Sequence, residues 1–162
     1  GFEMTGNFKN VLSAEIDKYA CETYEYLYGE NPYNDVTSEE FKNKVENTNY
    51  DVLLGGFPCQ SFSIAGKKEG FKDKTRGTLF FDVADIIDRT RPKAFLLENV
   101  EGITTHDKGR TFTTIVETLV NDLGYHMIGV EEGLGGYLEF NKDEIIRNTK
   151  NFGFHKKDQE HI

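Results

Sequence analysis

Two short apolar segments constrain the fold most strongly, because each leads into residues able to do chemistry. Residues 51–54 (Asp-Val-Leu-Leu) run into Gly-Gly-Phe-Pro-Cys, and residues 94–97 (Ala-Phe-Leu-Leu) run into Glu-Asn-Val. Short apolar runs bounded by glycine or proline are typical of buried strands. Open α/β sheets bind ligands at the carboxyl ends of their strands. The sequence therefore predicts that the thiol of Cys59 and the carboxylate of Glu98 meet at one sheet edge, a pairing suited to covalent catalysis.

Helical periodicity and capping signals surround these segments. Helices are expected at residues 17–27 (capped by Asp17), 39–46 (capped by Thr37 or Ser38), 79–89 and 107–123 (capped by Asp107 and ended by Gly124). Strands are expected at residues 11–15, 52–57 and 94–98, with a fourth opening at 125–130. Alternating strands and helices predict an α/β fold with a mostly parallel sheet.

The same periodicity predicts which side chains share a face. The last two helices place these residues inward: Phe80, Val83, Ala84, Ile86, Ile87, Phe112, Ile115, Val116, Leu119 and Leu123. The first helix gathers Tyr19, Ala20, Tyr24 and Leu27 on one face, and Cys21 is expected to be a small buried thiol.

Length and composition bound the class of protein. With 162 residues and 37% hydrophobic content, one folded domain is expected. The chain contains no apolar run long enough for a membrane span, and from its first residues no secretory leader is expected. Two cysteines and no Cys/His metal spacing predict a reducing, cytoplasmic compartment and no metal site.

The net charge of −9 argues at first against a nucleic-acid partner, yet the charge is uneven. Residues 66–76 carry four lysines and an arginine against two acids, directly after Cys59. Such a loop can contact phosphates, although taken alone it is more often a solvated loop.

The motifs together resemble a known family. Residues 56–63 (Gly-Phe-Pro-Cys-Gln-Ser-Phe-Ser), 76–80 (Arg-Gly-Thr-Leu-Phe) and 98–100 (Glu-Asn-Val) occur in this order, after residues 15–20 and the Asp35-Val36 pair. This arrangement resembles the cytosine-C5 DNA methyltransferases, above all those of bacterial restriction–modification systems. The resemblance covers residues 1–130 and implies a Rossmann-like methyltransferase fold that uses S-adenosylmethionine.

The resemblance also implies roles for single residues. Cys59 would add to C6 of a cytosine flipped out of double-stranded DNA, Glu98 would contact N3 and the exocyclic amine, and Asn99 would orient the loop. The residues implied at the cofactor are Phe2, Glu15, Ile16, Asp35, Val36, Pro58 and Leu79. The implied DNA contacts are Gln60, Ser63, Lys67, Lys68 and Arg76.

Some of these residues also have purely structural explanations. Glu15 alone is more typical of an ordinary polar strand end, and Asp35 is compatible with a simple Asx turn. His106, which could be taken for a base serving Cys59, is expected instead on an exposed loop before the Asp107 cap.

The sequence also departs from the family pattern. The Gly-rich first turn, the Gln-x-Arg-x-Arg segment, the DNA-reading region and the C-terminal helix are not found, so the fold is expected to be incomplete. Residues 131–162, with a helical patch at 142–149, match no family element by inspection and are treated as a separate segment. A fragment, a split-enzyme subunit needing a second chain, and joined pieces of a longer protein all stay open.

Three functions are therefore compatible with the sequence. The first is DNA cytosine-C5 methylation, the second is the same chemistry on RNA, and the third is a non-catalytic module that binds the cofactor or a partner. Intact Cys59 and Glu98 favour the first two, whereas the missing Gly-rich turn favours the third.

Overall fold

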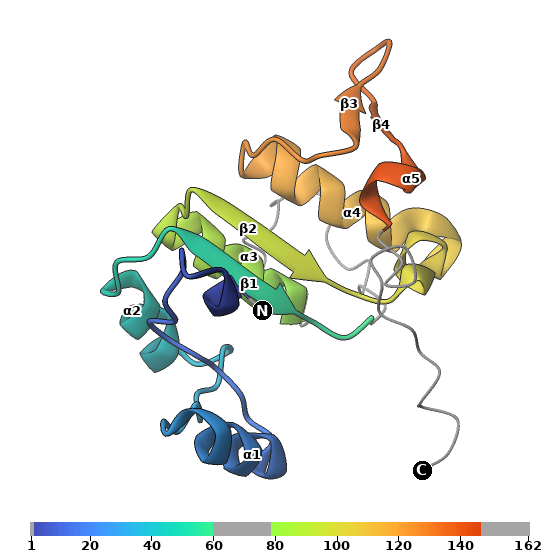
Figure 1. Ribbon diagram of the computed structural model, residues 1–162. Coiled ribbons are helices and arrows are strands. Elements are labelled where there is room, and N and C mark those ends of the chain that lie inside the picture. Colours follow the sequence, from blue (N-terminus) through green and yellow to red (C-terminus); the bar gives the residue numbers. More distant parts are fainter. Residues whose placement is uncertain (1, 60–78, 147–162) are drawn as a thin grey trace, which may run out of the picture. The chain divides into compact units, whose positions relative to one another are not determined.

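The computed structural model describes residues 2–59 and 79–146 (Figure 1). The chain divides into two compact units, Gly1–Val100 and Glu101–Ile162. The first unit contains a 3-10 turn at Phe2–Thr5, α1 (Lys18–Tyr28), α2 (Glu39–Glu46), β1 (Val52–Gly56), α3 (Leu79–Thr90) and β2 (Ala94–Glu98). The second contains 3-10 turns at Glu101–Thr104 and His106–Gly109, α4 (Arg110–Glu117), a π-helical turn (Thr118–Asp122), β3 (Val130–Glu132), β4 (Leu138–Phe140) and α5 (Lys142–Ile145).

The first unit is built on a parallel pair of strands, β1 and β2, in register from Val52 opposite Ala94 to Gly56 opposite Glu98. Helix α3 covers one face of this pair (Figure 1). On the opposite face Leu54 and Leu96 remain 53% and 57% exposed. The parallel pairing and the covering helix confirm the predicted α/β architecture.

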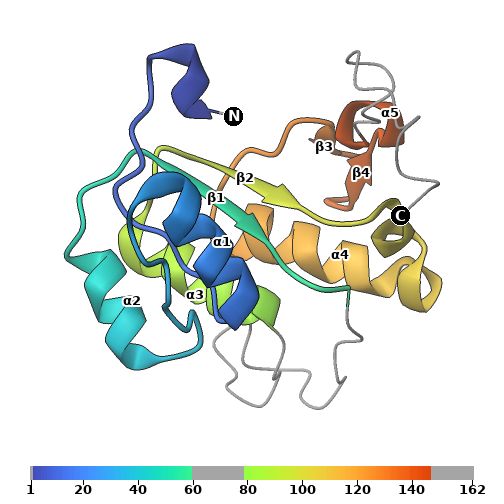
Figure 2. The ribbon, with the colours of Figure 1, turned by 60° about the horizontal axis from the view of Figure 1, so that its bottom comes forward.

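Helix α2 lies beside α3 in the first unit (Figure 2). Ser38 begins α2, because its hydroxyl accepts a hydrogen bond from Phe41 N at 3.1 Å. Phe41 and Val45 of α2 pack with Ile86 of α3, and Leu12, Val36, Tyr50 and Leu53 surround this cluster. The predicted inward face of α3 is confirmed, since its apolar members are at most 8% exposed.

The predicted strand at residues 11–15 is wrong. Only Glu15 pairs with a neighbouring segment, through an isolated parallel bridge to Tyr33. At Ser13 the backbone carbonyl accepts instead from the side-chain amide of Asn34 at 2.7 Å, where a strand would receive a backbone N–H. Side-chain bonding has here replaced the ladder that the apolar alternation predicts.

Helix α1 begins and ends as predicted but buries less than its pattern suggests. Asp17 caps it by accepting from Ala20 N at 2.8 Å, and Gly29 ends it with φ 76°. Cys21 is buried, whereas Tyr19 and Leu27 are 74% and 61% exposed. The shared apolar face is therefore not a core face within this structure.

The helix predicted at residues 107–123 is interrupted at its start. Asp107 and Lys108 have φ 51° and 59°, in the left-handed region, so Asp107 is no N-cap and α4 begins only at Arg110. The Arg110 guanidinium donates to both the carboxylate and the carbonyl of Asp107, which holds this turn. The predicted inward residues are nevertheless confirmed, because Phe112, Ile115, Val116, Leu119 and Leu123 are at most 5% exposed.

The strand predicted at residues 125–130 is also wrong in extent and direction. β3 starts only at Val130 and pairs antiparallel with β4, through a turn in which Gly135 and Gly136 have φ 88° and 80°. Glycines that adopt positive φ favour a tight hairpin over continuation of a parallel sheet. Phe140 of β4 packs against Phe112 with ring centroids 5.0 Å apart. Of the helix predicted at 142–149, the structure has α5, which ends at Ile145; residue 146 is not helical, and residues 147–149 lie outside the described residues.

Candidate active site

The carboxyl ends of β1 and β2 lie side by side and form the centre of the candidate site. Gly56, the last residue of β1, stands opposite Glu98, the last residue of β2. Cys59 follows Gly56 by three positions and is a half-buried free thiol. The thiol-bearing loop and the carboxylate therefore leave the sheet at the same edge.

Asn99 joins the two loops that leave this edge. Its side-chain amide donates from Nδ2 to the carbonyl of Phe57 at 2.5 Å, and its Oδ1 accepts from Val100 N at 2.9 Å. Phe57 is held on its other side by Phe80 of α3, with ring centroids 5.3 Å apart. The start of the Cys59 loop is thus anchored by a half-buried hydrogen bond and by an aromatic contact.

Glu98 lies over a strand position that has no side chain. A Cβ atom built on Gly56 would approach Glu98 Oε2 to 3.3 Å, which is tighter than most Cβ contacts. Glu98 itself is exposed, on the same face as Leu54 and Leu96. A side chain at residue 56 would therefore push the carboxylate away from its present position.

Two further carboxylates, those of Glu15 and Asp35, lie on neighbouring segments before β1. Glu15 Oε1 accepts from the backbone N–H groups of Ile16 and Asp17, both at 2.8 Å. The Glu15 backbone donates to Pro32 O at 3.1 Å and accepts from Asn34 N at 3.1 Å. These bonds place Glu15 next to the segment that carries Asp35.

Asp35 heads the turn that leads into α2. Its Oδ1 accepts from Thr37 N at 2.9 Å and from the Thr37 hydroxyl at 2.8 Å, so the expected Asx-type turn is present. These hydrogen bonds, first that of the Thr37 N–H and then that of its hydroxyl, lower the pKa of the Asp35 carboxyl. Val36 is half-buried against the cluster around Phe41.

These residues suit the nucleoside end of S-adenosylmethionine. Carboxylates at Glu15 and Asp35 can accept hydrogen bonds from ribose hydroxyls and from the adenine amine. Ile16 is 63% exposed and offers an apolar surface for a base. The donor and acceptor chemistry therefore fits the cofactor that the resemblance implies.

The other expected site residues are less closely tied together. Phe2 packs edge-on against Phe8, with ring centroids 5.0 Å apart. Pro58 is exposed in the Cys59 loop, and Leu79 is half-buried at the start of α3. The expected DNA contacts, Gln60, Ser63, Lys67, Lys68 and Arg76, lie outside the described residues.

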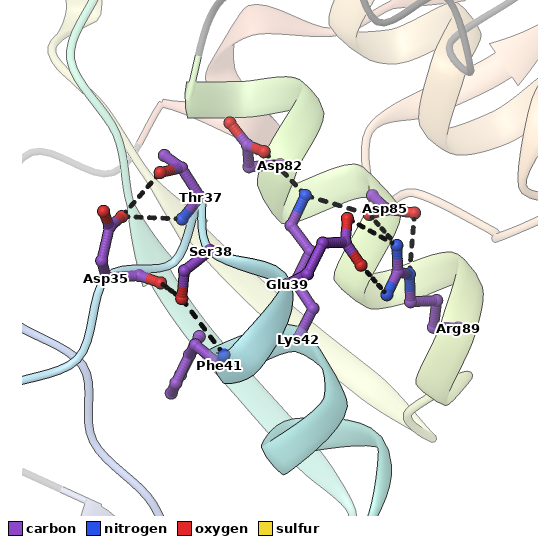
Figure 3. A network of polar contacts seen from close by, with 9 residues as sticks. All are labelled: Asp35, Thr37, Ser38, Glu39, Phe41, Lys42, Asp82, Asp85 and Arg89. Atoms are coloured by element: carbon purple, nitrogen blue, oxygen red, sulfur yellow. Dashed lines mark hydrogen bonds and ion pairs between the residues drawn. The ribbon is translucent and has the colours of Figure 1, made fainter.

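A charged network that sequence reasoning missed joins α2 to α3 (Figure 3). The Lys42 ammonium lies 2.7 Å from Asp82 and 3.0 Å from Asp85, and its side chain is only 7% exposed. Arg89 contacts Asp85 at 3.0 Å and Glu39 at 2.9 Å. The available signal was Lys42 itself, a cation four residues after the Ser38 cap at a core-facing helical position.

The charges in this network stabilise one another. Burial alone would lower the pKa of Lys42, but hydrogen bonds and charges from Asp82 and Asp85 raise it overall. Burial would raise the pKa of Asp85, yet Lys42 and Arg89 hold it below its ordinary value. The hydrogen bond from Arg89 likewise lowers the pKa of Glu39. Lys42, Asp85 and Glu39 are therefore charged at neutral pH.

His106 is part of the second unit, where its Nδ1 lies 2.8 Å from the hydroxyl of Thr111, a residue that is 1% exposed. In the part of the chain that the structure describes, no three His, Cys, Asp or Glu side chains gather as metal ligands would. In that same part, no helix is both long and apolar enough to cross a membrane.

The sequence is similar to those of known DNA methyltransferases. The model of the family described as C-5 cytosine-specific DNA methylase matches residues 1–130. The chain is 51% identical over 145 residues to the type II methyltransferase M.HpaII of Haemophilus parainfluenzae, covering 90% of this chain and 36% of that protein. It is 54% identical over 127 residues to M1.ScrFI of Lactococcus lactis subsp. cremoris, covering 78% of this chain and 31% of that protein.

A further relative matches more of the chain. M.SsoII of Shigella sonnei, also a type II methyltransferase, is 43% identical over 164 residues, covering 95% of this chain and 42% of that protein. This similarity therefore extends beyond residue 130 into the segment that the sequence motifs left unassigned. The chain spans between 31% and 42% of the length of these three relatives.

Proposed function

Because the chain belongs to the C-5 cytosine-specific DNA methylase family, we propose that the protein transfers a methyl group from S-adenosylmethionine to C5 of cytosine in double-stranded DNA. The observation that carries this proposal is the parallel register of β1 and β2, which sets Glu98 opposite Gly56 at the start of the Cys59 loop. The proposed setting is a restriction–modification system in the bacterial cytoplasm. Residues 1–130 would form the catalytic part.

Cys59 and Glu98 divide the chemistry between them. The Cys59 thiolate forms a bond to C6 of the cytosine, and the electron pair of the C5–C6 double bond becomes available at C5. Glu98 hydrogen-bonds at N3 and at the exocyclic amine and so stabilises the charge that develops on the ring. S-adenosylmethionine supplies the methyl group as an electrophile to C5. Loss of the C5 proton to a base then returns an electron pair to the ring and releases the Cys59 sulfur.

Asn99 positions the Cys59 loop in this scheme and does not itself react. Its amide holds the carbonyl of Phe57 at 2.5 Å, two residues before Cys59, and it directly follows Glu98 in the chain. Asn99 therefore ties the position of the nucleophile to that of the carboxylate. Such alignment of reacting groups supplies a large part of the rate in enzymes of this kind.

The cofactor is proposed to bind across the segments that carry Glu15 and Asp35. Glu15 would hold the ribose hydroxyls, Ile16 would pack on the adenine, and Asp35 with Val36 would meet the amine and ring edge. Phe2, Pro58 and Leu79 complete the proposed lining.

The DNA is proposed to present a flipped cytosine, since C6 lies inside the stacked duplex, and flipping costs roughly a few kcal/mol. Gln60, Ser63, Lys67, Lys68 and Arg76 would contact the DNA around that base. A second chain is a further possible source of the region that reads the target sequence.

Covalent trapping tests the proposal directly. Duplex oligonucleotides containing 5-fluorocytosine are incubated with S-adenosylmethionine and the protein, and the products are separated on a denaturing gel. Fluorine cannot leave as a cation, so a reacting enzyme stays bound through sulfur to C6. We expect an adduct with the unaltered protein and with Cys21→Ala, the matched cysteine control, and none with Cys59→Ala.

The other outcomes discriminate between functions. An adduct that survives Cys59→Ala would contradict the assigned nucleophile. An adduct formed only with a 5-fluorocytosine-containing tRNA would favour an RNA substrate. Cofactor binding by calorimetry without any adduct, even when a partner chain is supplied, would favour a binding module.

A further inference from the structure

The charged network between α2 and α3 is the strongest feature that the proposed chemistry does not use. Lys42 is 7% exposed along its side chain and contacts two carboxylates, at 2.7 Å and 3.0 Å. Replacing a buried ion pair by apolar residues is often neutral or stabilising, so burial of a lysine here is weak evidence for stability. A directional contact, however, restricts how two helices slide or turn against each other more sharply than the packing of a few apolar side chains does.

Helix α2 needs such a restriction. It has eight residues, and its buried apolar side chains are Phe41 and Val45. Packing between so few apolar groups is non-directional. Lys42 adds contacts to Asp82 and Asp85, which lie one turn apart on α3. Because Lys42 contacts two carboxylates of α3, these contacts restrict both the position of α2 along α3 and the rotation of α2 about its own axis.

A continuous chain of hydrogen bonds connects Lys42 to Asp35. The backbone N–H of Lys42 donates to Ser38 O at 3.1 Å. The Ser38 hydroxyl donates to Asp35 O at 2.8 Å, and Ser38 N donates to the same carbonyl at 3.1 Å. Thr37 then fixes the Asp35 carboxylate through its N–H and hydroxyl (Figure 3). A shift of α2 must therefore move the Asp35 carboxylate.

The other end of the connection reaches the start of α3. Asp82 is one turn beyond Leu79, the first residue of α3. Leu79 follows the segment that the proposed function assigns to DNA, and it is itself a proposed cofactor-lining residue. The ion pair therefore links the adenine end of the proposed cofactor site to the helix that begins beside it.

We propose that Lys42 is a positioning residue for the cofactor: by bridging Asp82 and Asp85 it holds the Asp35–Ser38 turn in place and so fixes the carboxylate that recognises the adenine amine. This inference rests on the proposed function. Lys42 contacts no reacting atom in it. Its effect is on recognition of the base, and the chemical step at Cys59 does not depend on it directly.

Discrimination between two nucleosides provides a readout that a merely structural lysine would not move. S-adenosylhomocysteine carries the 6-amino group, whereas S-inosylhomocysteine carries a 6-oxo group that cannot donate to Asp35. Binding of each to the full chain is measured by isothermal titration, well below the unfolding temperature. We expect the unaltered chain to prefer the adenosyl compound by roughly tenfold or more, as for a hydrogen bond to a charged group.

Variants then separate a role of Lys42 in positioning Asp35 from a role in the stability of the fold. Lys42→Met is expected to reduce the preference to within about threefold, and Lys42→Arg to restore most of it, because arginine keeps the charge. Lys93→Met is the matched control: it removes an exposed ion pair with Asp51, 2.6 Å long, and is expected to keep the full preference. If Lys42→Met does not fold, Lys42→Met/Asp82→Asn takes its place, because Asp85 remains paired with Arg89.

Two failures remain distinguishable. Equal binding of both nucleosides, or no binding of either, by the unaltered chain would overturn the cofactor site of the proposed function, and this inference with it. A full preference in the unaltered chain that persists in a folded Lys42→Met or double variant would overturn the role of Lys42 alone. A loss of preference in Lys93→Met as large as that in Lys42→Met would also overturn it.

Discussion

The strand ends and the α2–α3 interface treat their charges in opposite ways. At the strand ends, Glu98 is exposed and Cys59 is half-buried. At the interface, the Lys42 ammonium is almost fully buried between two carboxylates. A group that must touch a substrate has to stay accessible, whereas a group that fixes geometry works best when it is paired and away from water. Substitutions in the two regions should therefore fail in different ways.

The largest expected effect is on chemistry alone. Glu98→Gln cannot give a proton to N3, so the developing ring anion is less stabilised, and adduct formation with 5-fluorocytosine should slow by about 100-fold to 10,000-fold. Thermal unfolding should stay as in the unaltered protein, because the side chain is exposed. Rapid trapping followed on gels gives the rate. An unchanged rate would remove Glu98 from the proposed mechanism.

The opposite pattern is expected at the interface. Lys42→Met leaves Asp82 and Asp85 without their shared cation and should lower the free energy of unfolding by about 3 kcal/mol. This is the low end for a broken buried pair, because the two carboxylates remain 27% and 32% exposed. Urea unfolding followed by circular dichroism measures the loss, with Lys18→Met, on exposed α1, as control. Equal stability of the two variants would contradict the buried role of Lys42.

Two adjacent glycines of β1, Gly55 and Gly56, allow the exposed and covered faces of the strand to be tested separately. Gly56→Ala places a methyl group 3.3 Å from Glu98 Oε2, and we expect adduct formation to slow by roughly tenfold, since small misplacements of catalytic groups are costly. Gly55→Ala points to the covered face, where the nearest atom is Leu97 Cδ2 at 3.4 Å. Gly55→Ala should lower the stability against unfolding but change the rate of adduct formation little. The same kinetic defect in both variants would mean that Glu98 is not the group disturbed.

The smallest expected effect is the acid dependence of stability. The pKa values of Glu39 and Asp85 are lowered in the fold, so the unfolded chain binds protons first as the pH falls. Their contribution is fully present above the unfolded pKa values, about 4, and is lost as the pH falls through the folded ones. Melting temperatures between pH 6 and pH 3 should decline less steeply in Glu39→Gln than in the unaltered chain. The exposed neighbour provides the control, Glu40→Gln, and an equal change of slope in both would contradict the assignment.

Features that depend on neighbours along the chain could be predicted from the sequence alone. Asp17, Ser38 and Gly29 mark helix ends because capping needs only residues three or four positions away. Apolar periodicity likewise identified the buried faces of α3 and α4. The ordered motifs identified the family and the candidate residues at the strand ends.

Features that depend on contacts between residues distant in sequence could not be predicted. Residues 11–15 have a strand-like pattern but form no strand, because the Asn34 side chain takes the Ser13 carbonyl. The sequence places a cation, Lys42, at a core-facing helical position but does not identify its partners Asp82 and Asp85, which lie at least 40 residues further along the chain. Charges become paired and buried only when two helices meet, and no local pattern records that meeting.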